Sequence, residues 1–473
     1  MDAAESLKLF LPETLLLAGA FLVLFLDFFI QNKRTLGLIP LGVLGLVAFL
    51  AKEIPSSPQS LFFGFFELDT FTYFFRMAAL GIVAVTLLAS LAYKPLPQNY
   101  GGEYYALFLF MAFGLILMAA SANLLMIFLS VEFVSILSYL LVGFLKKDAR
   151  SKEAAIKYLL FGSVASAVML YGMSLLYGVS GSLNLAQIAG PAGDPSFFMP
   201  TLFAAIFFLV GLGFKISMAP FHMWAPDVYE GAPTPVTAFL TVGPKALGFA
   251  VLIRVLTVVF PGMWPEWSRI MMVLSILTMT IGNVAAISQT NSKRLLAYSS
   301  IAQAGYILMG LVVFTDTGLT AVLIYLLAYA FTNLGAFAVV ITASGVFGND
   351  EIDSYAGLAK RSPFLAASLT IFLLSLAGIP PFAGFIGKFY VFLSAIEAGF
   401  ITLAIAAALN SAVAAFYYFR VVRVMYLTPS ASSEPMTRTF SLNFALFLML
   451  AGTLILGLMP STWITFVKGM LLV

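Results

Sequence analysis

The sequence predicts an all-α polytopic membrane protein with about 14 transmembrane helices, and two observations carry that prediction. Hydrophobic residues make up 62% of the 473 residues and charged residues only 10%, whereas charged residues form about a quarter of a soluble domain. Apolar runs of roughly 20 residues, enough to cross a hydrocarbon core of about 30 Å, follow one another along the chain. A β-barrel is excluded, because its strands would alternate over about ten residues.

The expected spans are apolar stretches separated by short polar connections. The first follows the acidic start MDAAESLK, with no basic segment before it and no small-residue cleavage site after it, so we expect a retained span rather than a signal peptide. The stretches cover residues 9–30, 35–51, 70–93, 104–121, 123–145, 153–178, 200–220, 235–260, 267–289, 294–314, 319–346, 363–396, 400–427 and 440–468.

Basic residues gather at alternate connections between the spans. They include Lys33 and the cluster from Lys146 to Lys152, whereas the connections 180–199 and 315–318 contain no lysine or arginine. Lysine and arginine are enriched in cytoplasmic loops of membrane proteins. We therefore expect the basic side to be cytoplasmic and both termini to lie outside.

Composition also excludes several classes of function. The chain contains no cysteine and one histidine, His222, which excludes thiolate-ligated Fe–S clusters and histidine-rich metal centres. The net charge of +3 is too small to indicate nucleic-acid binding. We expect this chain to bind the lipid bilayer, but no nucleic acid, metal or cofactor.

Three pairs of segments align at offsets of 166 to 171 residues, placing Glu132 against Gln303, Tyr158 against Tyr325 and Lys245 against Ser411. Internal symmetry of this kind is typical of transporter folds. We expect two five-helix repeats, the second inverted because five is odd. The predicted parts are an N-terminal unit of three spans at 1–103, a first repeat with spans four to eight at 104–260, a second with spans nine to thirteen at 261–427, and span fourteen at 428–473.

Two spans are predicted to be discontinuous helices. KISMAPFHMWAP at 215–226 ends span seven, and LAGIPPFAGFIGKFY at 376–390 lies within span twelve. Prolines and glycines at this density interrupt a helix. Freed backbone groups at membrane depth are tolerated only where protein or a hydrated cavity satisfies them, so we expect an ion site at each break.

Charged residues inside the spans are the candidate functional residues. A charge at the bilayer centre costs about 2.5–3.5 kcal/mol or more, and such residues usually mark an ion or proton path. Glu132, Lys215, Lys245 and Lys388 fit this description. The alternatives are a structural ion pair for Glu132 and a lysine that reaches the membrane surface for Lys388.

Two further candidates have stronger alternatives. Lys157 lies only five residues after Lys152, so its side chain could extend to the membrane surface. His222 follows the break in span seven, where it is either an ordinary hydrogen-bonded histidine or a proton carrier.

Three segments carry a family resemblance: FKISMAPFHMWAPDVYEGAPTPVTAFLTVGPKALGFA at 214–250, SKRLLAYSSIAQAGYILMG at 292–310 and GIPPFAGFIGKFYVF at 378–392. They resemble the antiporter-like membrane subunits of respiratory complex I, the proton-pumping NADH:quinone oxidoreductase. The resemblance implies a fourteen-helix bundle in a prokaryotic plasma (inner) membrane, with the other membrane subunits as partners. NADH, FMN, Fe–S clusters and quinone would then be bound by partner subunits.

That family has three large paralogous types. One resembles a bundle followed by a long lateral helix, whereas this chain stops at Val473, directly after the last expected span. Another usually has glutamate where this chain has Lys388. We therefore expect the third type, which the segment DVYEGAPTPV also resembles.

The resemblance assigns a proton relay to six titratable residues, namely Glu132, Lys157, Lys215, His222, Lys245 and Lys388. It pairs Glu132 with Lys215, puts His222 and Lys245 at the centre and Lys388 near the exit. Redox chemistry in other subunits would separate Glu132 from Lys215 and so release the lysine's proton. Some members have histidine in place of Gln303; an amide cannot titrate, so that link would use water or the amide's hydrogen bonds.

Two other functions stay open. Subunits of multisubunit Na+/H+ antiporters share the same helical bundle, and sodium-dependent collapse of a pH gradient without NADH or quinone would favour them. The chain could also be a non-pumping structural subunit whose buried charges form structural pairs.

Overall fold

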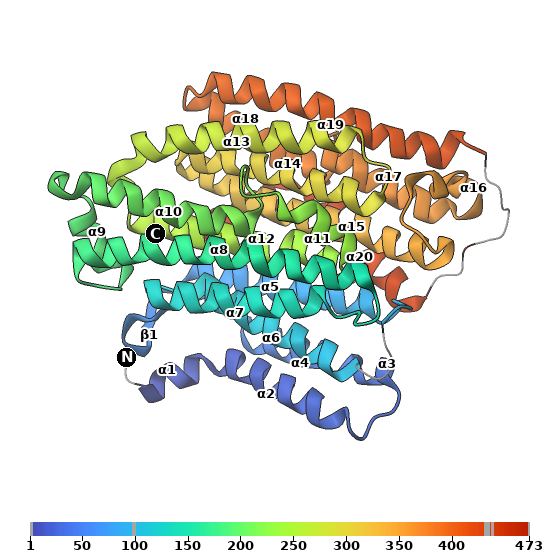
Figure 1. Cartoon of the computed structure of the whole chain (residues 1–473), viewed down its shortest axis with the longest axis horizontal. Helices are drawn as coiled ribbons and strands as arrows, with labels where there is room; N and C mark the ends of the chain where they lie inside the picture. Colours follow the sequence, from blue (N-terminus) through green and yellow to red (C-terminus); the bar gives the residue numbers. More distant parts are fainter. Residues whose placement is uncertain (1–2, 97–100, 430–435, 437–438, 472–473) are drawn as a thin grey trace.

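The computed structural model describes residues 3–96, 101–429, 436 and 439–471, and most of these residues form a bundle of long helices that run in roughly the same direction (Figure 1). The expected all-α membrane fold is confirmed. The described residues include only two strands, β1 (Gln59–Leu61) and β2 (Phe66–Leu68), which pair antiparallel. Helices satisfy their own backbone polar groups, as a bilayer requires.

The helices of the N-terminal part are α1 (Ala3–Leu9), α2 (Leu11–Leu26), α3 (Lys33–Leu36), α4 (Leu38–Leu50) and α5 (Thr70–Ser90). α1 to α4 lie along one side of the bundle, at the bottom of Figure 1, whereas α5 packs against α12 (Thr234–Val258) inside it.

The first expected repeat contains seven helices of very different lengths: α6 (Gly101–Ala120), α7 (Leu124–Val142), α8 (Ala149–Ser180), α9 (Leu185–Ala192), α10 (Phe198–Ile216), α11 (Trp224–Gly231) and α12 (Thr234–Val258). The remaining helices are α13 (Trp264–Ile287), α14 (Ser292–Val313), α15 (Asp316–Phe347), α16 (Leu358–Arg361), α17 (Pro363–Ala377), α18 (Ala383–Glu397), α19 (Ile401–Leu427), α20 (Phe440–Leu458) and α21 (Pro460–Lys468).

The number of spans differs from a simple count of apolar stretches. Within the described ranges, 12 helices are long and apolar enough to cross a membrane, or 13 if α1 and α2, bent by 70°, form one span. The expected span 363–396 is divided into α17 and α18, each of 15 residues. The expected span 440–468 is also divided, because α20 ends before Pro460. The expected total of fourteen is reached if α1 with α2, and α17 with α18, each count as one span. That total stays a prediction.

The expected interruptions of spans seven and twelve are present. α10 ends at Ile216, followed by Ser217 in the left-handed region with φ of 58°. α17 ends in the same way, followed by Gly378 with φ of 87°. The breaks contain cis peptide bonds at Ala219–Pro220 and Pro380–Pro381. Proline has no backbone N–H and cannot continue the helical hydrogen bonds, which accounts for both ends.

Two isolated backbone bridges lie at corresponding places in the expected repeats. Asn123 pairs with Asn184, and Asn291 pairs with Glu351. The side chains of Asn123 and Asn291 also cap the helices that follow them, α7 and α14. α8 and α15 are both 32 residues long. The helices after them, α9 and α16, lie at opposite ends of the bundle (Figure 1). These features support an inverted repeat, whose boundaries stay a prediction.

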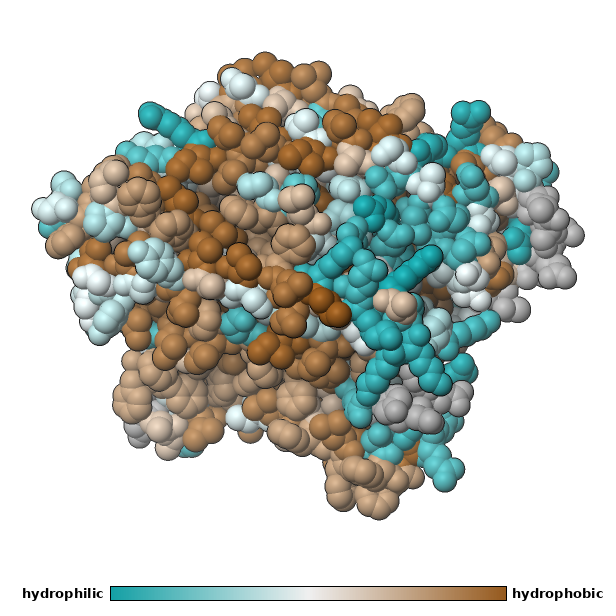
Figure 2. Space-filling view, in the orientation of Figure 1, coloured by the Kyte–Doolittle hydropathy of each residue, from teal (hydrophilic) through white to brown (hydrophobic). Residues whose placement is uncertain are grey.

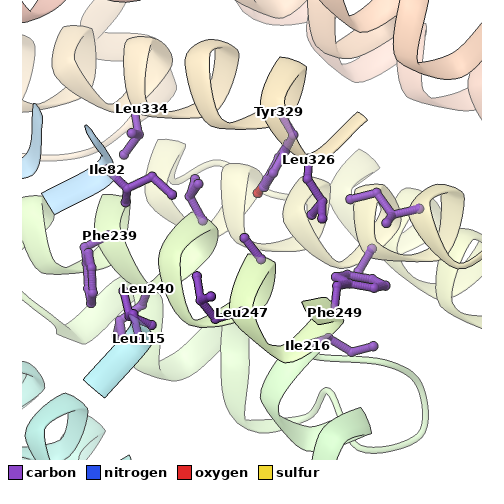
Figure 3. Packing of buried hydrophobic residues seen from close by; sticks show 14 of the residues in the cluster. Ile82, Leu115, Ile216, Phe239, Leu240, Leu247, Phe249, Leu326, Tyr329 and Leu334 are labelled. Atoms are coloured by element: carbon purple, nitrogen blue, oxygen red, sulfur yellow. The ribbon is translucent and has the colours of Figure 1, made fainter. Parts of the chain in front are cut away.

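α12 forms the centre of the bundle. Every residue from Thr234 to Leu256 is buried. Figure 3 shows its apolar side chains, among them Phe239 and Leu247, packed near α15. Membrane helices associate through close packing and interhelical hydrogen bonds. Polar groups on α12 therefore contact other helices rather than lipid.

Hydrophilic residues gather towards one end of the bundle, on the right of Figure 2. We call the end that carries Lys146, Arg150, Lys293 and Arg294 the basic end. It corresponds to the expected cytoplasmic side, an orientation that stays a prediction.

α2 and α5 share a buried charge pair that the sequence analysis does not include. Arg76 Nη2 lies 2.5 Å from Glu13 Oε1, and the two side chains are 7% and 0% exposed. Breaking such a pair leaves a charge without a partner in an apolar interior. This pair links α2 to α5 within the N-terminal part.

Replacing Glu13 alone by leucine is expected to destabilise the chain by about 3–5 kcal/mol, because Arg76 would stay charged and unpaired. The double variant Glu13→Leu with Arg76→Leu should recover most of that loss, because replacing both partners of a buried pair by apolar groups is often neutral. Thermal unfolding in native membranes measures both effects. A double variant as unstable as the single one would contradict this explanation.

Candidate functional site

Three of the lysines singled out in the sequence are buried on three different helices. Lys215 lies at the end of α10, Lys245 in the middle of α12 and Lys388 in α18, with exposures of 2%, 3% and 3%. In the part of the chain that the structure describes, none of them forms an ion pair. Each Nζ instead donates to a serine hydroxyl, and two of them also donate to a backbone carbonyl.

Lys215 reaches from the first helix break to α7. Its Nζ donates to Ser135 Oγ at 2.9 Å. Glu132 lies one turn earlier on α7, and its Oε1 accepts a short hydrogen bond from Ser166 on α8. Glu132 and Lys215 form no ion pair among the described residues; each is bonded to a serine instead. Their expected pairing in the relay stays a prediction.

Lys245 joins α12 to α14. Its Nζ donates to the Ser300 carbonyl at 3.1 Å and forms a short contact with the Ser300 hydroxyl. The Tyr229 ring lies 5.7 Å from the ammonium, close enough for a cation–π interaction. All of these partners are neutral.

Gln303 lies between Lys245 and Lys388, at the expected gap in the relay. Its amide nitrogen donates to the Leu376 carbonyl at 3.1 Å and to the Tyr418 hydroxyl at 3.3 Å. Its oxygen accepts from the Tyr325 hydroxyl at 2.5 Å. Tyr418 also contacts Ser299 at 2.5 Å. The amide of Gln303 therefore contacts two tyrosine hydroxyls. This arrangement is compatible with a link through the amide's hydrogen bonds in place of a titrating histidine.

Lys388 reaches back to the second break. Its Nζ donates to the Ala377 carbonyl at 3.0 Å and to Ser411 Oγ at 2.9 Å, and lies 4.5 Å from the centre of the Tyr306 ring. Gly378 is required beside it, because a Cβ there would lie 2.6 Å from Lys388 Cδ and φ is positive. The α17 terminus thus provides both a free carbonyl and room for the lysine.

Lys157 differs from the three buried lysines. Its side chain is 39% exposed and lies 2.9 Å from Glu153 and 2.8 Å from Asp227. Arg294 binds the other oxygen of Asp227 at 2.8 Å. This ion-pair network at the basic end agrees with the alternative of a lysine near the membrane surface.

His222 lies in the break between α10 and α11 and is partly buried. Its Nδ1 is buried and has no hydrogen-bond partner among the described residues. His222 makes no hydrogen bond to Lys215, Lys245 or Lys388 among the described residues, and its place in the relay stays a prediction.

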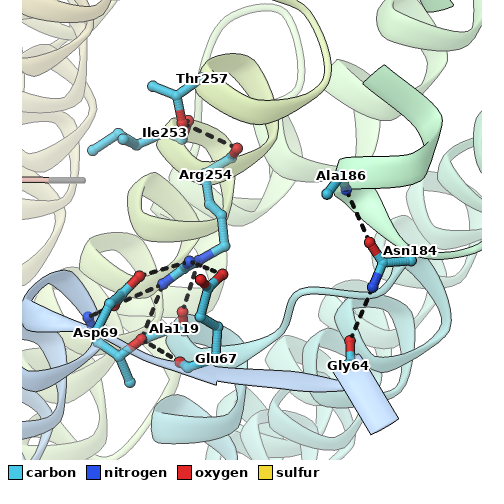
Figure 4. A network of polar contacts seen from close by, with 10 residues as sticks. Gly64, Glu67, Asp69, Ala119, Asn184, Ala186, Ile253, Arg254 and Thr257 are labelled. Atoms are coloured by element: carbon cyan, nitrogen blue, oxygen red, sulfur yellow. Dashed lines mark hydrogen bonds and ion pairs between the residues drawn. The ribbon is translucent and has the colours of Figure 1, made fainter. Parts of the chain in front are cut away.

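Acidic and hydroxyl groups surround Arg254 at the end of α12 that lies away from the basic end (Figure 4). The sequence analysis did not predict this cluster. Arg254 donates to both Asp69 oxygens, at 2.9 and 3.1 Å, to Thr72 at 2.9 Å and to the Ala119 carbonyl at 3.2 Å. Glu67 lies 3.4 Å away, and burial raises its pKa in spite of the guanidinium. Arg254 and Asp69 are 185 residues apart, so no local pattern could predict the contact.

Comparison with known proteins gives a consistent family. Residues 121–414, more than half of the chain, match the family model described as NADH:quinone oxidoreductase/Mrp antiporter, TM. NADH-quinone oxidoreductase subunit N of Trichlorobacter lovleyi is 43% identical over 471 residues, which cover 98% of this chain and 96% of that protein.

Comparison with solved structures gives the same family. A chain of respiratory complex I from Thermus thermophilus with bound aureothin has a TM-score of 0.82 and 32% identity, covering 96% of this chain and 98% of that one. A chain of the Mrp complex from Dietzia sp. DQ12-45-1b has a TM-score of 0.85 and 22% identity, covering 97% of each chain, and shows a shared fold alone. The N subunit is the third type expected from the sequence. The chain therefore belongs to the NADH:quinone oxidoreductase/Mrp antiporter family of membrane proteins, as an NADH-quinone oxidoreductase subunit of the N type.

Proposed function

We propose that this chain moves protons across the membrane through Lys215, Lys245 and Lys388, driven by quinone reduction in partner subunits. One observation carries the proposal: within the described ranges, each buried lysine is bonded only to neutral groups. A carboxylate partner would hold the proton on the ammonium by charge attraction. A serine hydroxyl can donate or accept, so it can serve the ammonium and the neutral amine in turn.

The hydrogen bonds divide the route into short steps. Lys245 reaches Ser300, and the adjacent Ser299 contacts Tyr418, which binds Gln303. Gln303 and Lys388 then donate to consecutive carbonyls, those of Leu376 and Ala377. The amide does not carry the proton in this proposal. It orients the hydroxyls of Tyr325 and Tyr418, which can.

Glu132 supplies the movable charge in this proposal. It is held by Ser166 on α8, whereas Lys215 is held by Ser135, one turn along α7. Rotation of the carboxylate from Ser166 towards Ser135 would stabilise the ammonium form of Lys215. His222 and Lys157 complete the six proposed relay residues, with His222 beside the centre and Lys157 at the basic end.

The redox cofactors belong to partner subunits. The chain has no cysteine and so cannot hold an Fe–S cluster by thiolates. Among the residues placed by the structure, no group of three or more His, Asp or Glu side chains could hold a metal ion. The proposal assigns NADH oxidation on FMN, electron transfer through Fe–S clusters and quinone reduction to other subunits of the complex.

The Lys215→Ala variant of the assembled complex is expected to lose nearly all of this chain's contribution to the proton-to-electron ratio, because the Ser135 hydroxyl would have no proton carrier beside it. The ratio is measured in proteoliposomes from acidification and quinone reduction. Lys152→Ala, which removes an exposed lysine on α8, is the matched control and should pump normally.

An undiminished ratio in both Lys215→Ala and Glu132→Ala would contradict the proposal. Sodium-dependent collapse of a pH gradient without NADH or quinone would instead indicate an antiporter. Lower abundance of the complex, with normal pumping by each assembled copy, would indicate a structural subunit.

Gln303→Leu is expected to reduce pumping more than quinone reduction, because it leaves the Leu376 carbonyl and the Tyr325 hydroxyl without partners, at about 1–3 kcal/mol each. Gln303→His, which places a polar, titratable ring at the same position, should preserve most of the pumping. Gln289→Leu, near the basic end, is the control for amide loss. Undiminished pumping by Gln303→Leu would show that the amide does not link the two lysines.

A further inference from the structure

A groove of about 590 Å³ lies between α5, α15, α20 and α21. Its walls are apolar, with Phe75 and Ile82 from α5, Leu334 from α15 and Leu448 from α20 among the residues that form them. Figure 3 shows Ile82 and Leu334 near one another on their two helices. A cavity lined by such residues stays dry and binds apolar molecules. We call it the α5–α20 groove.

The α5–α20 groove is open to the surroundings of the bundle. Two of its lining residues, Ile455 and Phe466, are 47% and 38% exposed. A Cβ at Gly81, which also lines the groove, would meet no described atom within 4 Å, so helix packing does not require this glycine. α5, α15 and α20 are long and apolar enough to cross a membrane, and lipid tails surround such helices. The groove therefore faces either acyl chains or an apolar segment of a partner.

The depth of the groove matches one leaflet of a bilayer. Its lining residues on α5 run from Tyr73 to Val85, about 18 Å at the helical rise of 1.5 Å per residue. Half of the hydrocarbon core is about 15 Å thick. The groove also reaches Ala246, beside Lys245 in the middle of α12. A helix about 10 Å wide would fill roughly 1,400 Å³ over that length. A single acyl chain therefore fits the groove, whereas a helix does not.

Two lysines lie near the start of α5, where the groove meets the membrane surface. The hydroxyl of Tyr73, which lines the groove, donates to the Lys52 carbonyl at 3.2 Å. The Thr70 hydroxyl donates to the Leu471 carbonyl at 3.3 Å. Leu471 comes three residues after Lys468, the last residue of α21, so the end of α21 lies at the start of α5. Both lysines are exposed.

The residues at this end of the groove favour a lipid with an anionic headgroup. Lysine at a membrane surface attracts such headgroups. Glu53 follows Lys52 and offsets one of the two lysine charges, which leaves this group of three with a net positive charge. Trp463 lines the groove on α21, and tryptophan is enriched at the level of the headgroups. A quinone has no anionic group to meet the lysines, so charge favours a phospholipid over a quinone tail.

We infer that the α5–α20 groove binds one acyl chain of a phospholipid whose anionic headgroup lies against Lys52 and Lys468. The chain fills the space between α5, α15 and α20 and reaches α12 in the middle of the membrane. The lipid site is separate from the proposed relay, because Lys245 extends from α12 to Ser300 on α14, and Ser300 does not line the groove. The lipid supplies packing and carries no proton.

Photo-crosslinking in the assembled complex tests the acyl-chain site. Phosphatidylglycerol with a diazirine in one acyl chain should label lining residues of α5 and α20, and mass spectrometry of this chain locates the label. Gly81→Phe, which fills the groove, should lose most of that labelling. Gly45→Phe on α4 is the matched control, because a Cβ there also meets no described atom within 4 Å and Gly45 does not line the groove. Its groove should be labelled as strongly as that of the unchanged chain.

Comparison of two headgroups tests the role of the lysines. The same diazirine chain on phosphatidylcholine, which has no net charge, should label the groove more weakly than on phosphatidylglycerol. The double variant Lys52→Gln with Lys468→Gln should be labelled equally by both lipids, because the attraction for the anionic headgroup is lost. Lys360→Gln removes an exposed lysine on α16 and should keep the preference for phosphatidylglycerol.

Several outcomes would overturn the inference. An unlabelled groove in the unchanged chain, or equal labelling of Gly81→Phe and Gly45→Phe, would exclude the acyl-chain site. Equal labelling of the unchanged chain by both lipids would exclude the anionic headgroup. Loss of the label on addition of excess ubiquinone would assign the groove to a quinone tail instead. If Gly81→Phe does not assemble, the position of the label in the unchanged chain and the headgroup preference decide. None of these results depends on whether Lys215→Ala pumps.

Discussion

Backbone carbonyls freed by the broken helices must find donors inside the membrane, and this requirement places the site. At the second break, the carbonyls of Leu376 and Ala377 accept from Gln303 and Lys388. At the first, the Phe214 carbonyl accepts from the Trp224 indole at 3.1 Å. An unsatisfied backbone group in hydrocarbon costs several kcal/mol. The bonds that make the second break stable therefore also position the lysine that the proposed relay uses.

Local sequence properties predict much of the fold and the buried lysines. Span length follows from runs of apolar residues, and a helix break follows from proline's missing N–H, so the interruptions after Ile216 and Ala377 were predicted. Burial of Lys215, Lys245 and Lys388 follows from their distance to the span ends. The separate serine partners of Glu132 and Lys215 could not be predicted in the same way, because they depend on which hydroxyl each side chain faces.

The partners of the lysines had no signal in the sequence. Serine in a membrane helix commonly bonds a carbonyl of its own helix, as Ser135 does with Val131, so its presence indicates neither a site nor a partner. Contacts between segments far apart in the sequence are equally hard to predict. The pairs Glu13–Arg76 and Arg254–Asp69 join helices whose order along the chain does not determine which faces meet. Tertiary packing alone decides such contacts.

The two halves of the bundle differ in charge at one pair of aligned positions, Glu132 and Gln303. The offset of 171 residues that aligns Glu132 with Gln303 also aligns Ser135 with Tyr306. Ser135 binds Lys215, and Tyr306 faces Lys388, so each lysine from a broken helix meets the corresponding place on its partner helix. Only the first half has a carboxylate there. In the proposed relay, redox work in the partner subunits sets the direction of proton movement. The carboxylate of Glu132, which has no counterpart at Gln303, gives that work a charge to act on in the first half of the bundle.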